Sequence, residues 1–395
     1  MATTRPHARF ASLLACRPLL YSPRVLLALI ALLAVGLTLN GIHTSPDSFS
    51  NYTIYRLSFH HLRHGVGLYL PDPNHHFDLF KYSPTFALLM APFWVLPRTP
   101  GLLIWNLLNA LAPFWAVMRL NLDARGRAFV LLFSLVELQT SLHNAQSNGI
   151  LAGLMIGAFA AFERRQVATA ALLLCLGFYN KPFAAVPGLL FLFYPGKLRF
   201  LATAAIGGIG LGLLPAAFLG GDGLVATYRE WMTLLANDHP HEANYSLMSL
   251  VRTFFHRRLP VIAYLGPGFG FLLLPMARRS LWGEPGYRLM VFAGMLVWLV
   301  IFNHKAESPT YLIAVLGAGL WALAEPRSRA RTCLLTFVFV VTEAAATDLC
   351  PRGIRIAWVQ PYGLKALPCV VLWLALTLRL TLSRRFAARL SDTGG

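Results

Sequence analysis

Long apolar runs separated by short polar turns set the pattern of this chain. A spanning helix requires roughly 20 apolar residues, with a range of about 17–25. Twelve runs approach or reach this length, and each predicts one crossing. They lie near residues 25–41, 101–118, 128–142, 148–162, 166–180, 183–195, 200–219, 259–277, 288–302, 309–324, 330–347 and 364–382. The pattern predicts an all-α polytopic bundle of about 12 transmembrane helices, a single integral membrane domain over residues 1–395.

One further apolar run, residues 84–97, is predicted not to cross. It reads PTFALLMAPFWVLP, with a proline at each end and one inside. Such a run is too short for a regular span, and its prolines interrupt a helix. A crossing here would also invert every later loop and place the basic turns outside. We therefore expect a re-entrant or interfacial segment near 84–97.

The composition supports a membrane protein. The chain is 56% hydrophobic and 13% charged, with a mean hydropathy of +0.57. Soluble domains average about 25% charged residues, and disordered chains are more polar still. The five cysteines show no paired spacing, so neither a zinc site nor a disulfide framework is indicated.

The net charge of +18 fixes the expected orientation. Lys and Arg occur in short clusters between apolar runs, as in cytoplasmic loops, so nucleic acid is not the expected partner. Leaving 84–97 on the outer side gives cytoplasmic termini. The loops 42–100 and 220–258 are then extracytoplasmic, and a catalytic surface has to form from these loops and the outer helix ends.

The first large loop contains an expected surface helix and two candidate bases. Phe49, Tyr52 and Phe59 belong to an aromatic series at helical spacing, which predicts an amphipathic helix on the membrane. Asp47 and Asp78 flank this stretch. Either carboxylate could accept a proton from a hydroxyl group during group transfer, although a plain hydrogen-bonding role remains open for each.

Three polar turns join spans at the expected outer face. They are residues 143–149, 179–182 and 303–309. Their amides and hydroxyls could merely cap helices. Lys181 and Lys305, however, stand between apolar spans on the side disfavoured for positive charge, which indicates a bound anion such as phosphate.

Two further features leave alternatives open. Glu137, inside a span, could orient Lys181 or a histidine, or form a separate ion pair. Histidines 60, 61, 64, 75 and 76 could share a metal, but no acidic residue stands in register with them, so no metal is predicted. The chain also lacks glycine-rich nucleotide loops, and no cofactor is predicted.

Several short motifs together resemble glycosyltransferase family 87 of the GT-C superfamily. They are Phe80-Lys-Tyr82-Ser-Pro84 with a following apolar run ending at Leu96-Pro97, Gln146-x-Asn148-Gly149, Lys181-Pro182 and Asn244-Tyr-Ser246-Leu247. The resemblance rests on the order and spacing of these motifs over residues 25–320. The resemblance implies a transferase that moves a hexose, typically mannose, from a polyprenyl-phosphate donor to a lipid or glycan acceptor.

The resemblance also implies a location and a set of roles. Such enzymes work at the outer face of the bacterial plasma membrane, among membrane lipids, and direct displacement with inversion is expected. The family's loop motif Asp-Phe-x-x-Tyr is altered here, because Ser48 precedes Phe49 and Asp47 lies one residue early. Asp47 or Asp78 would then be the base, with inactivity the alternative if neither reaches the acceptor.

The resulting site hypothesis has three groups of residues. Asp47, Asp78 and His304 are the catalytic candidates, and Lys181, Lys305 and Lys81 are expected to bind the donor phosphate. Substrate contacts are expected from Tyr52, Tyr82, His143, Gln146, Asn148, Asn180 and Asn244. A transporter or flippase is the main alternative, but the two halves show no internal repeat. An inactive scaffold subunit is the third possibility.

Overall fold

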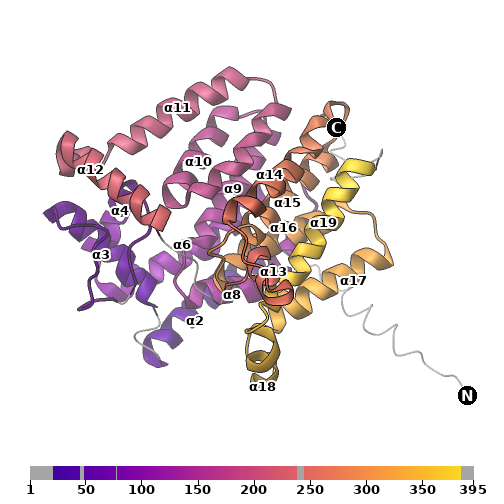
Figure 1. The fold of residues 1–395 in the computed structure, drawn as a ribbon, viewed down its shortest axis with the longest axis horizontal. Helices are drawn as coiled ribbons and strands as arrows, with labels where there is room; N and C mark the ends of the chain where they lie inside the picture. Colours follow the sequence, from indigo (N-terminus) through magenta and orange to yellow (C-terminus); the bar gives the residue numbers. More distant parts are fainter. Residues whose placement is uncertain (1–20, 45–48, 77, 238–243, 384–395) are drawn as a thin grey trace, which may run out of the picture.

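The protein is helical throughout the part described by the computed structural model, residues 21–44, 49–76, 78–237 and 244–383, in which no strand occurs (Figure 1). The α-helices are α2 Pro23–Thr44, α3 Ser50–His64, α4 Pro84–Leu89, α5 Ala91–Val95, α6 Arg98–Met118, α7 Ala124–Phe133, α8 Leu135–His143, α9 Asn148–Glu163, α10 Val167–Asn180, α11 Lys197–Leu213, α12 Ala216–Asn237, α13 Leu247–Phe255, α14 Val261–Leu273, α15 Pro285–Ile301, α16 Tyr311–Ala324, α17 Arg329–Phe337, α18 Arg352–Ile354 and α19 Leu367–Leu382. The 3₁₀ segments are η3 Pro182–Phe193, η4 Pro275–Ala277, η5 Arg279–Leu281, η6 Ser308–Thr310 and η9 Leu364–Ala366, and the π-helical segments are η7 Val338–Ala344 and η8 Arg355–Val359.

The centre of the bundle is formed by α9, α15 and α16. Nearly every residue of α15 and α16 is buried, because apolar side chains surround both helices on all sides. Phe159 of α9 stacks on Phe292 of α15, with ring centroids 4.5 Å apart. Around this centre, α6 packs against α2 and α9, and α10 lies between α9 and α11. These buried helices hold the turns at their ends in fixed positions.

The outer helices expose large apolar side chains. Leu198 and Ile206 of α11 are 83% and 74% exposed, and Ile262 of α14 is 70% exposed. Water would disfavour so many exposed apolar side chains on one molecule. Lipid tails would cover them at no such cost, which agrees with a membrane protein.

Only some of the predicted crossings can be recognised individually. The helices α2, α6 and the combined segment Leu364–Leu382 are long and apolar enough to cross a membrane. The pair α11 and α12 passes the same test together but is bent by 98°. The other predicted runs are helical but shorter, some because a break divides them, as Ser134 separates α7 from α8. The all-helical fold is thus confirmed for the described residues, and three helices could cross a membrane, whereas twelve crossings stay a prediction.

The segment 84–97 begins and ends at the same end of the bundle. It forms the short helices α4 and α5, which meet at Met90. Before its start, the hydroxyl of Ser83 donates to the carbonyl of Tyr179 at the end of α10. Near its end, Arg56 of α3 donates to the carbonyl of Phe93 at 3.1 Å. Both ends of the segment thus contact elements that line the cavity described below, and the re-entrant or interfacial assignment stays a prediction.

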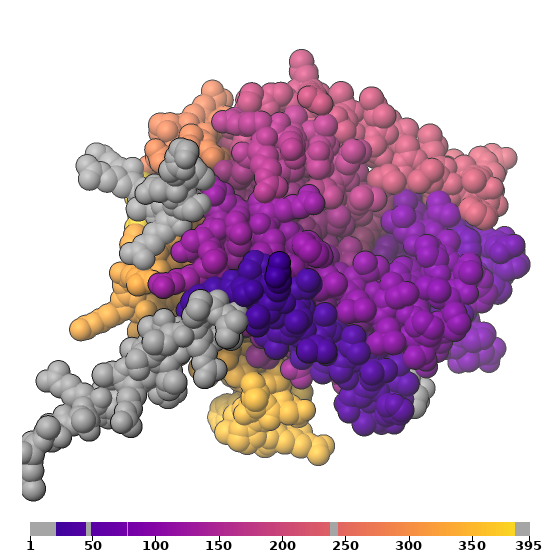
Figure 2. All heavy atoms as spheres, turned by 180° about the vertical axis from the view of Figure 1, so that it is seen from behind, coloured from indigo at the N-terminus to yellow at the C-terminus, as the bar shows by residue number. Residues whose placement is uncertain are grey.

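The expected helix in the first loop is α3, and its aromatic face is buried in protein. Tyr52, Tyr55 and Phe59 join a separate hydrophobic cluster with aromatic residues of α4, α5 and α6. The bend between α11 and α12 brings α12 against α3 and α4. Figure 2 shows the α11–α12 segment bordering the first-loop helices at one edge of the molecule. These contacts fix the first loop beside the bundle.

Basic residues gather at the opposite end of the bundle. Arg119, Arg125, Arg164, Arg279 and Arg329 are all exposed there. We call this the basic end. Two of its acidic residues form ion pairs: the Glu163 carboxylate lies 2.6 Å from Arg288, and that of Glu325 lies 2.7 Å from Arg379. The charge distribution therefore separates the basic end from the end that carries the polar turns.

Candidate functional site

A cavity of about 410 Å³ opens where the polar turns meet. Its walls come from α3, residues 78–82, the turn between α8 and α9, the junction of α10 and η3, and the turn between α15 and η6. Segments far apart in the sequence thus meet at one place. Among the predicted site residues, the cavity brings together Asp78, Lys81, Tyr82, Gln146, Asn180, Lys181, Asn244, His304 and Lys305.

The other predicted residues that the structure describes do not line this cavity. Asp47 lies outside the described residues. His143 is exposed at the end of α8. Tyr52 is fully buried, and its ring packs edge-on against Phe93. Asn148 is buried behind the wall, where it contacts Lys181. Tyr52 and Asn148 are therefore packed behind the site, and His143 is exposed outside the cavity.

Lys181 is held at the junction of α10 and η3. Its ammonium donates to Asn148 Oδ1 at 2.9 Å and lies 5.8 Å from the centre of the Tyr82 ring. Burial lowers the pKa of Lys181 to about 8, and the nearby Glu307 carboxylate acts in the opposite direction. Close to neutral pH the group is still mainly protonated. It is a partly desolvated cation facing a cavity, which is the environment expected for binding an anion.

A chain of hydrogen bonds runs along the wall. The hydroxyls of Tyr55 and Tyr82 lie 2.6 Å apart, and Tyr55 donates to Gln146 Oε1 at 3.3 Å. Gln146 Nε2 in turn donates to Glu307 Oε2 at 3.1 Å. Burial raises the pKa of both tyrosines, so they remain neutral hydroxyls. These hydrogen bonds connect the Tyr82 motif, the Gln146 turn and the 303–309 turn in one network.

Asp78 and Lys81 form an ion pair at the mouth of the cavity. The two charged groups approach to 3.1 Å, and the Asp78 side chain is 41% exposed. Asp78 Oδ1 also accepts the backbone N–H of Leu79 at 2.8 Å. Trp231 of α12 fixes the same loop by donating to the carbonyl of Lys81 at 3.2 Å. The carboxylate is therefore accessible and held in place.

The turn between α15 and η6 is held from behind. The backbone N–H of Tyr245 donates to the carbonyl of Ala306 at 2.9 Å, which docks the Asn244 segment onto this turn. Ser308 accepts a hydrogen bond from Lys365 at 2.7 Å, and Lys365 pairs with Glu137. The alternatives for Glu137 are thus resolved: it forms an ion pair with Lys365 and does not contact Lys181.

The Gln146 turn depends on two tight backbone positions. Ala145 adopts a positive φ of 47°, and its carbonyl accepts a 2.8 Å hydrogen bond from the Trp105 indole. Gly149 lies against α6 so closely that a Cβ atom would come within 2.0 Å of the carbonyl oxygen of Asn109. These constraints explain the glycine in the Gln146-x-Asn148-Gly149 motif.

Sequence analysis overlooked Glu307, Tyr55 and Asn51 as site residues, although all three line the cavity. The signal for Glu307 was its place in the same turn as Lys305. Tyr55 belonged to the aromatic face that was expected to anchor α3 in the membrane. Asn51 donates from its amide to the carbonyl of Asn144 at 3.0 Å, a contact no local pattern indicates.

The cavity combines cations, carboxylates and neutral hydrogen-bonding groups. Three lysines can stabilise a phosphate, and two carboxylates can accept a proton. Within the described ranges, no group of three or more His, Cys, Asp or Glu side chains is arranged to hold a metal ion. The chemistry that these residues can support is group transfer involving an anionic leaving group.

The fold and site together define an all-helical membrane protein with a polar cavity at one end of its bundle. The sequence model of glycosyltransferase family 87 matches residues 80–342, which is more than half of the chain. The chain therefore belongs to glycosyltransferase family 87, as its motifs indicated. A search of curated proteins found no match. The matched range includes Tyr82, Gln146, Lys181 and Glu307 but begins after Asp78.

Proposed function

We propose that this chain is a GT-C type transferase that moves a hexose, with mannose the first candidate, from a polyprenyl-phosphate donor to a lipid or glycan acceptor. The observation that carries the proposal is the cavity in which Lys81, Lys181 and Lys305 face the carboxylates of Asp78 and Glu307. A polyprenyl phosphate leaves with its negative charge, and fixed cations lower the barrier by stabilising that charge as it develops.

In the proposed reaction, the acceptor hydroxyl oxygen attacks the anomeric carbon of the sugar. The bond from that carbon to the phosphate oxygen breaks, and the leaving phosphate keeps the electron pair. Lys181 would face this phosphate, with Lys81 and Lys305 as further cations, and His304 would orient the phosphate or the acceptor. Attack opposite the leaving group inverts the configuration. Tyr82, Gln146, Asn180 and Asn244 would hydrogen-bond the sugar.

The proton of the acceptor hydroxyl has to pass to a carboxylate. Asp78 is a candidate because its carboxylate lines the cavity, is partly exposed and is held there by its ion pair with Lys81. Glu307 is a second candidate. Gln146 donates a hydrogen bond to one of its carboxylate oxygens, and the residue is exposed and lines the cavity. Asp47, which lies outside the described residues, is the third. Separate substitutions distinguish the three.

The basic end supports an orientation. Positive charge is concentrated on cytoplasmic loops of membrane proteins. We therefore assign the basic end to the cytoplasm and the cavity to the extracytoplasmic side of a bacterial plasma membrane, with both termini cytoplasmic. A donor with a polyprenyl tail would approach the cavity from the surrounding bilayer.

The test is transfer by the purified protein in lipid. The protein is incubated with radiolabelled polyprenyl-phosphate mannose or glucose and a membrane extract as acceptor. We expect labelled product with one donor, and a loss of about 100-fold or more for Lys181→Ala, in the range known for removal of one group that stabilises transition-state charge. Lys197→Ala, at the basic end, is the matched control. Absence of transfer with every polyprenyl-phosphate sugar, or full activity of Lys181→Ala, would refute the proposal.

Among the carboxylate variants, Asp47→Asn, Asp78→Asn and Glu307→Gln, the one that removes the base should lose kcat while the donor KM changes little. The other two should affect KM or nothing. Loss of kcat in none of them would mean that no carboxylate acts as the base.

A further inference from the structure

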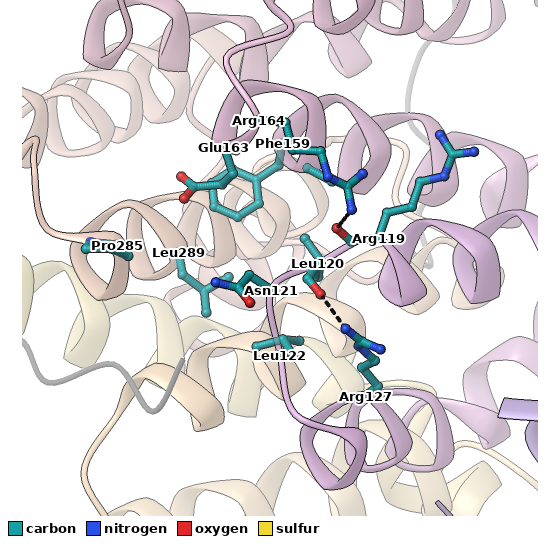
Figure 3. A pocket seen from close by; sticks show the side chains of 11 residues that line it. Arg119, Leu120, Asn121, Leu122, Arg127, Phe159, Glu163, Arg164, Pro285 and Leu289 are labelled. Atoms are coloured by element: carbon teal, nitrogen blue, oxygen red, sulfur yellow. Dashed lines mark hydrogen bonds between the residues drawn. The ribbon is translucent and has the colours of Figure 1, made fainter. Parts of the chain in front are cut away.

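The basic end contains a pocket that the transferase site does not use. It has a volume of about 320 Å³ and lies between the α6–α7 connection, the end of α9 and the start of α15. Three arginines line it: Arg119, Arg127 and Arg164. Figure 3 shows them along one side of the pocket, with Glu163 and Leu289 on the other.

The pocket keeps a net positive charge. Its single carboxylate, Glu163, is neutralised by a two-pronged contact with Arg288, at 2.6 and 2.8 Å. Arg164 donates one N–H to the carbonyl of Arg119, and Arg127 donates one to the carbonyl of Leu120. Each guanidinium has five N–H groups, so most remain for a ligand. The buried Nε of Arg127 has no hydrogen-bond partner among the described residues.

A second hollow adjoins this pocket and shares two of its arginines. It has a volume of about 230 Å³, and Arg119 and Arg164 stand at its edge. The rest of its wall is mainly apolar, with Trp115 of α6, Leu173 of α10 and Gly157 of α9 among its residues. Trp115 is 54% exposed, so this groove lies on the outer surface of the bundle. A cationic pocket thus continues into an apolar groove on the lipid-covered face.

We propose that these two hollows bind one anionic glycerophospholipid, with its phosphate at Arg119 and Arg164 and an acyl chain in the groove between α6 and α10. The charge of the pocket requires an anion, and arginine forks match the oxygen geometry of a phosphate. The apolar groove requires a hydrocarbon tail, which a soluble phosphate lacks. The site lies at the end opposite the transferase cavity, and it stands whether or not the proposed transfer reaction is correct.

The test measures lipid binding by native mass spectrometry from mixed micelles. The probes are dioleoylphosphatidylglycerol and the zwitterionic dioleoylphosphatidylcholine at equal concentrations. The wild-type protein should retain one phosphatidylglycerol in preference to phosphatidylcholine. An arginine near a membrane surface contributes roughly fivefold to the binding of anionic lipid. The double variant Arg119→Gln/Arg164→Gln should therefore lose at least about tenfold in affinity.

Matched variants separate this site from general surface charge. Arg199→Gln/Arg329→Gln removes the same charge from exposed positions that line neither hollow, and should retain the lipid. Gly157→Leu fills the groove and leaves the arginines intact, so it should also lose the lipid. Gly210→Leu, where a Cβ would meet nothing within 4 Å, is its control.

Three outcomes would overturn the proposal. One is equal loss in the two arginine pairs, which would indicate diffuse attraction. Another is full binding by Gly157→Leu together with displacement of the lipid by excess inorganic phosphate, which would indicate a soluble anion. The third is equal retention of both lipids by the wild-type protein. Thermal unfolding of each variant in detergent verifies that it is folded.

Discussion

The ammonium of Lys365 lies 2.6 Å from Glu137 Oε1, and neither side chain is exposed. The two residues are 228 positions apart in the sequence. The same ammonium donates to Ser308, the neighbour of Glu307 in the cavity wall. One buried lysine therefore joins α8, η9 and the turn that carries a candidate base.

Removing this lysine should destabilise the protein. Lys365→Met leaves the Glu137 carboxylate buried without its partner, which costs about 3 kcal/mol or more in the free energy of unfolding. Thermal unfolding followed by tryptophan fluorescence in detergent measures the effect. The additional change Glu137→Leu should restore part of the loss, and Lys197→Met, at an exposed position, should have little effect. Equal stability of the Lys365 and Lys197 variants would contradict the pairing.

Gly149 should not tolerate a side chain. In Gly149→Ala the new Cβ would collide with the carbonyl of Asn109, so α6 and α9 would have to separate. Overpacking of this kind typically costs about 1–3 kcal/mol. The measurement is the shift in midpoint temperature relative to Gly210→Ala, whose Cβ meets open space. If the two alanine variants unfold at the same temperature, the close packing of these helices is wrong.

The transfer rate should fall in alkaline solution. Burial lowers the pKa of Lys181 to about 8, so its ammonium is present below that pH and is lost as the pH rises through it. The profile of kcat/KM reports the free enzyme and should decline with an apparent pKa near 8. Lys181→Arg keeps its charge at every accessible pH, so whatever activity it retains should show no such decline. A decline unchanged in Lys181→Arg would assign it to another group.

Cysteine labelling tests the orientation. His143 and Arg329 are exposed at opposite ends of the bundle. In a background without native cysteines, an impermeant maleimide added to intact cells should label His143→Cys and leave Arg329→Cys unlabelled. Permeabilised cells, in which both should react, provide the control. The reverse pattern would place the cavity in the cytoplasm.

Local patterns were sufficient for much of the architecture. Apolar runs predicted helices because each has to bury its backbone polar groups within itself. The prolines of residues 84–97 indicated an interrupted helix, and the segment is indeed divided into α4 and α5. Lys181 was identified because an isolated cation between apolar helices needs a partner. These features depend on a few neighbouring residues, and so they can be recognised in the sequence.

Other features depend on contacts between distant segments. The spacing of Tyr52 marked it as part of an aromatic face, but only packing decides that Tyr52 meets Phe93 while Tyr55 meets the cavity. The partner of Glu137 could not be predicted, because Lys365 belongs to a helix near the other end of the chain. The apolar runs also do not fix the number of crossings. Several of them form helices that are too short to qualify as a span alone.

The left-handed alanine at position 145 has a consequence for how the Gln146 amide works. Glycine would adopt this backbone without strain, whereas an alanine there raises the energy of the folded state by about 1 kcal/mol. In return, alanine narrows the range of shapes open to the turn, and the Trp105 indole secures the one that remains. The turn thus gives up some stability for a fixed backbone. The Gln146 side chain is held in one orientation by its hydrogen bonds to Tyr55 and Glu307, so it would lose little conformational entropy on binding the sugar in the proposed reaction.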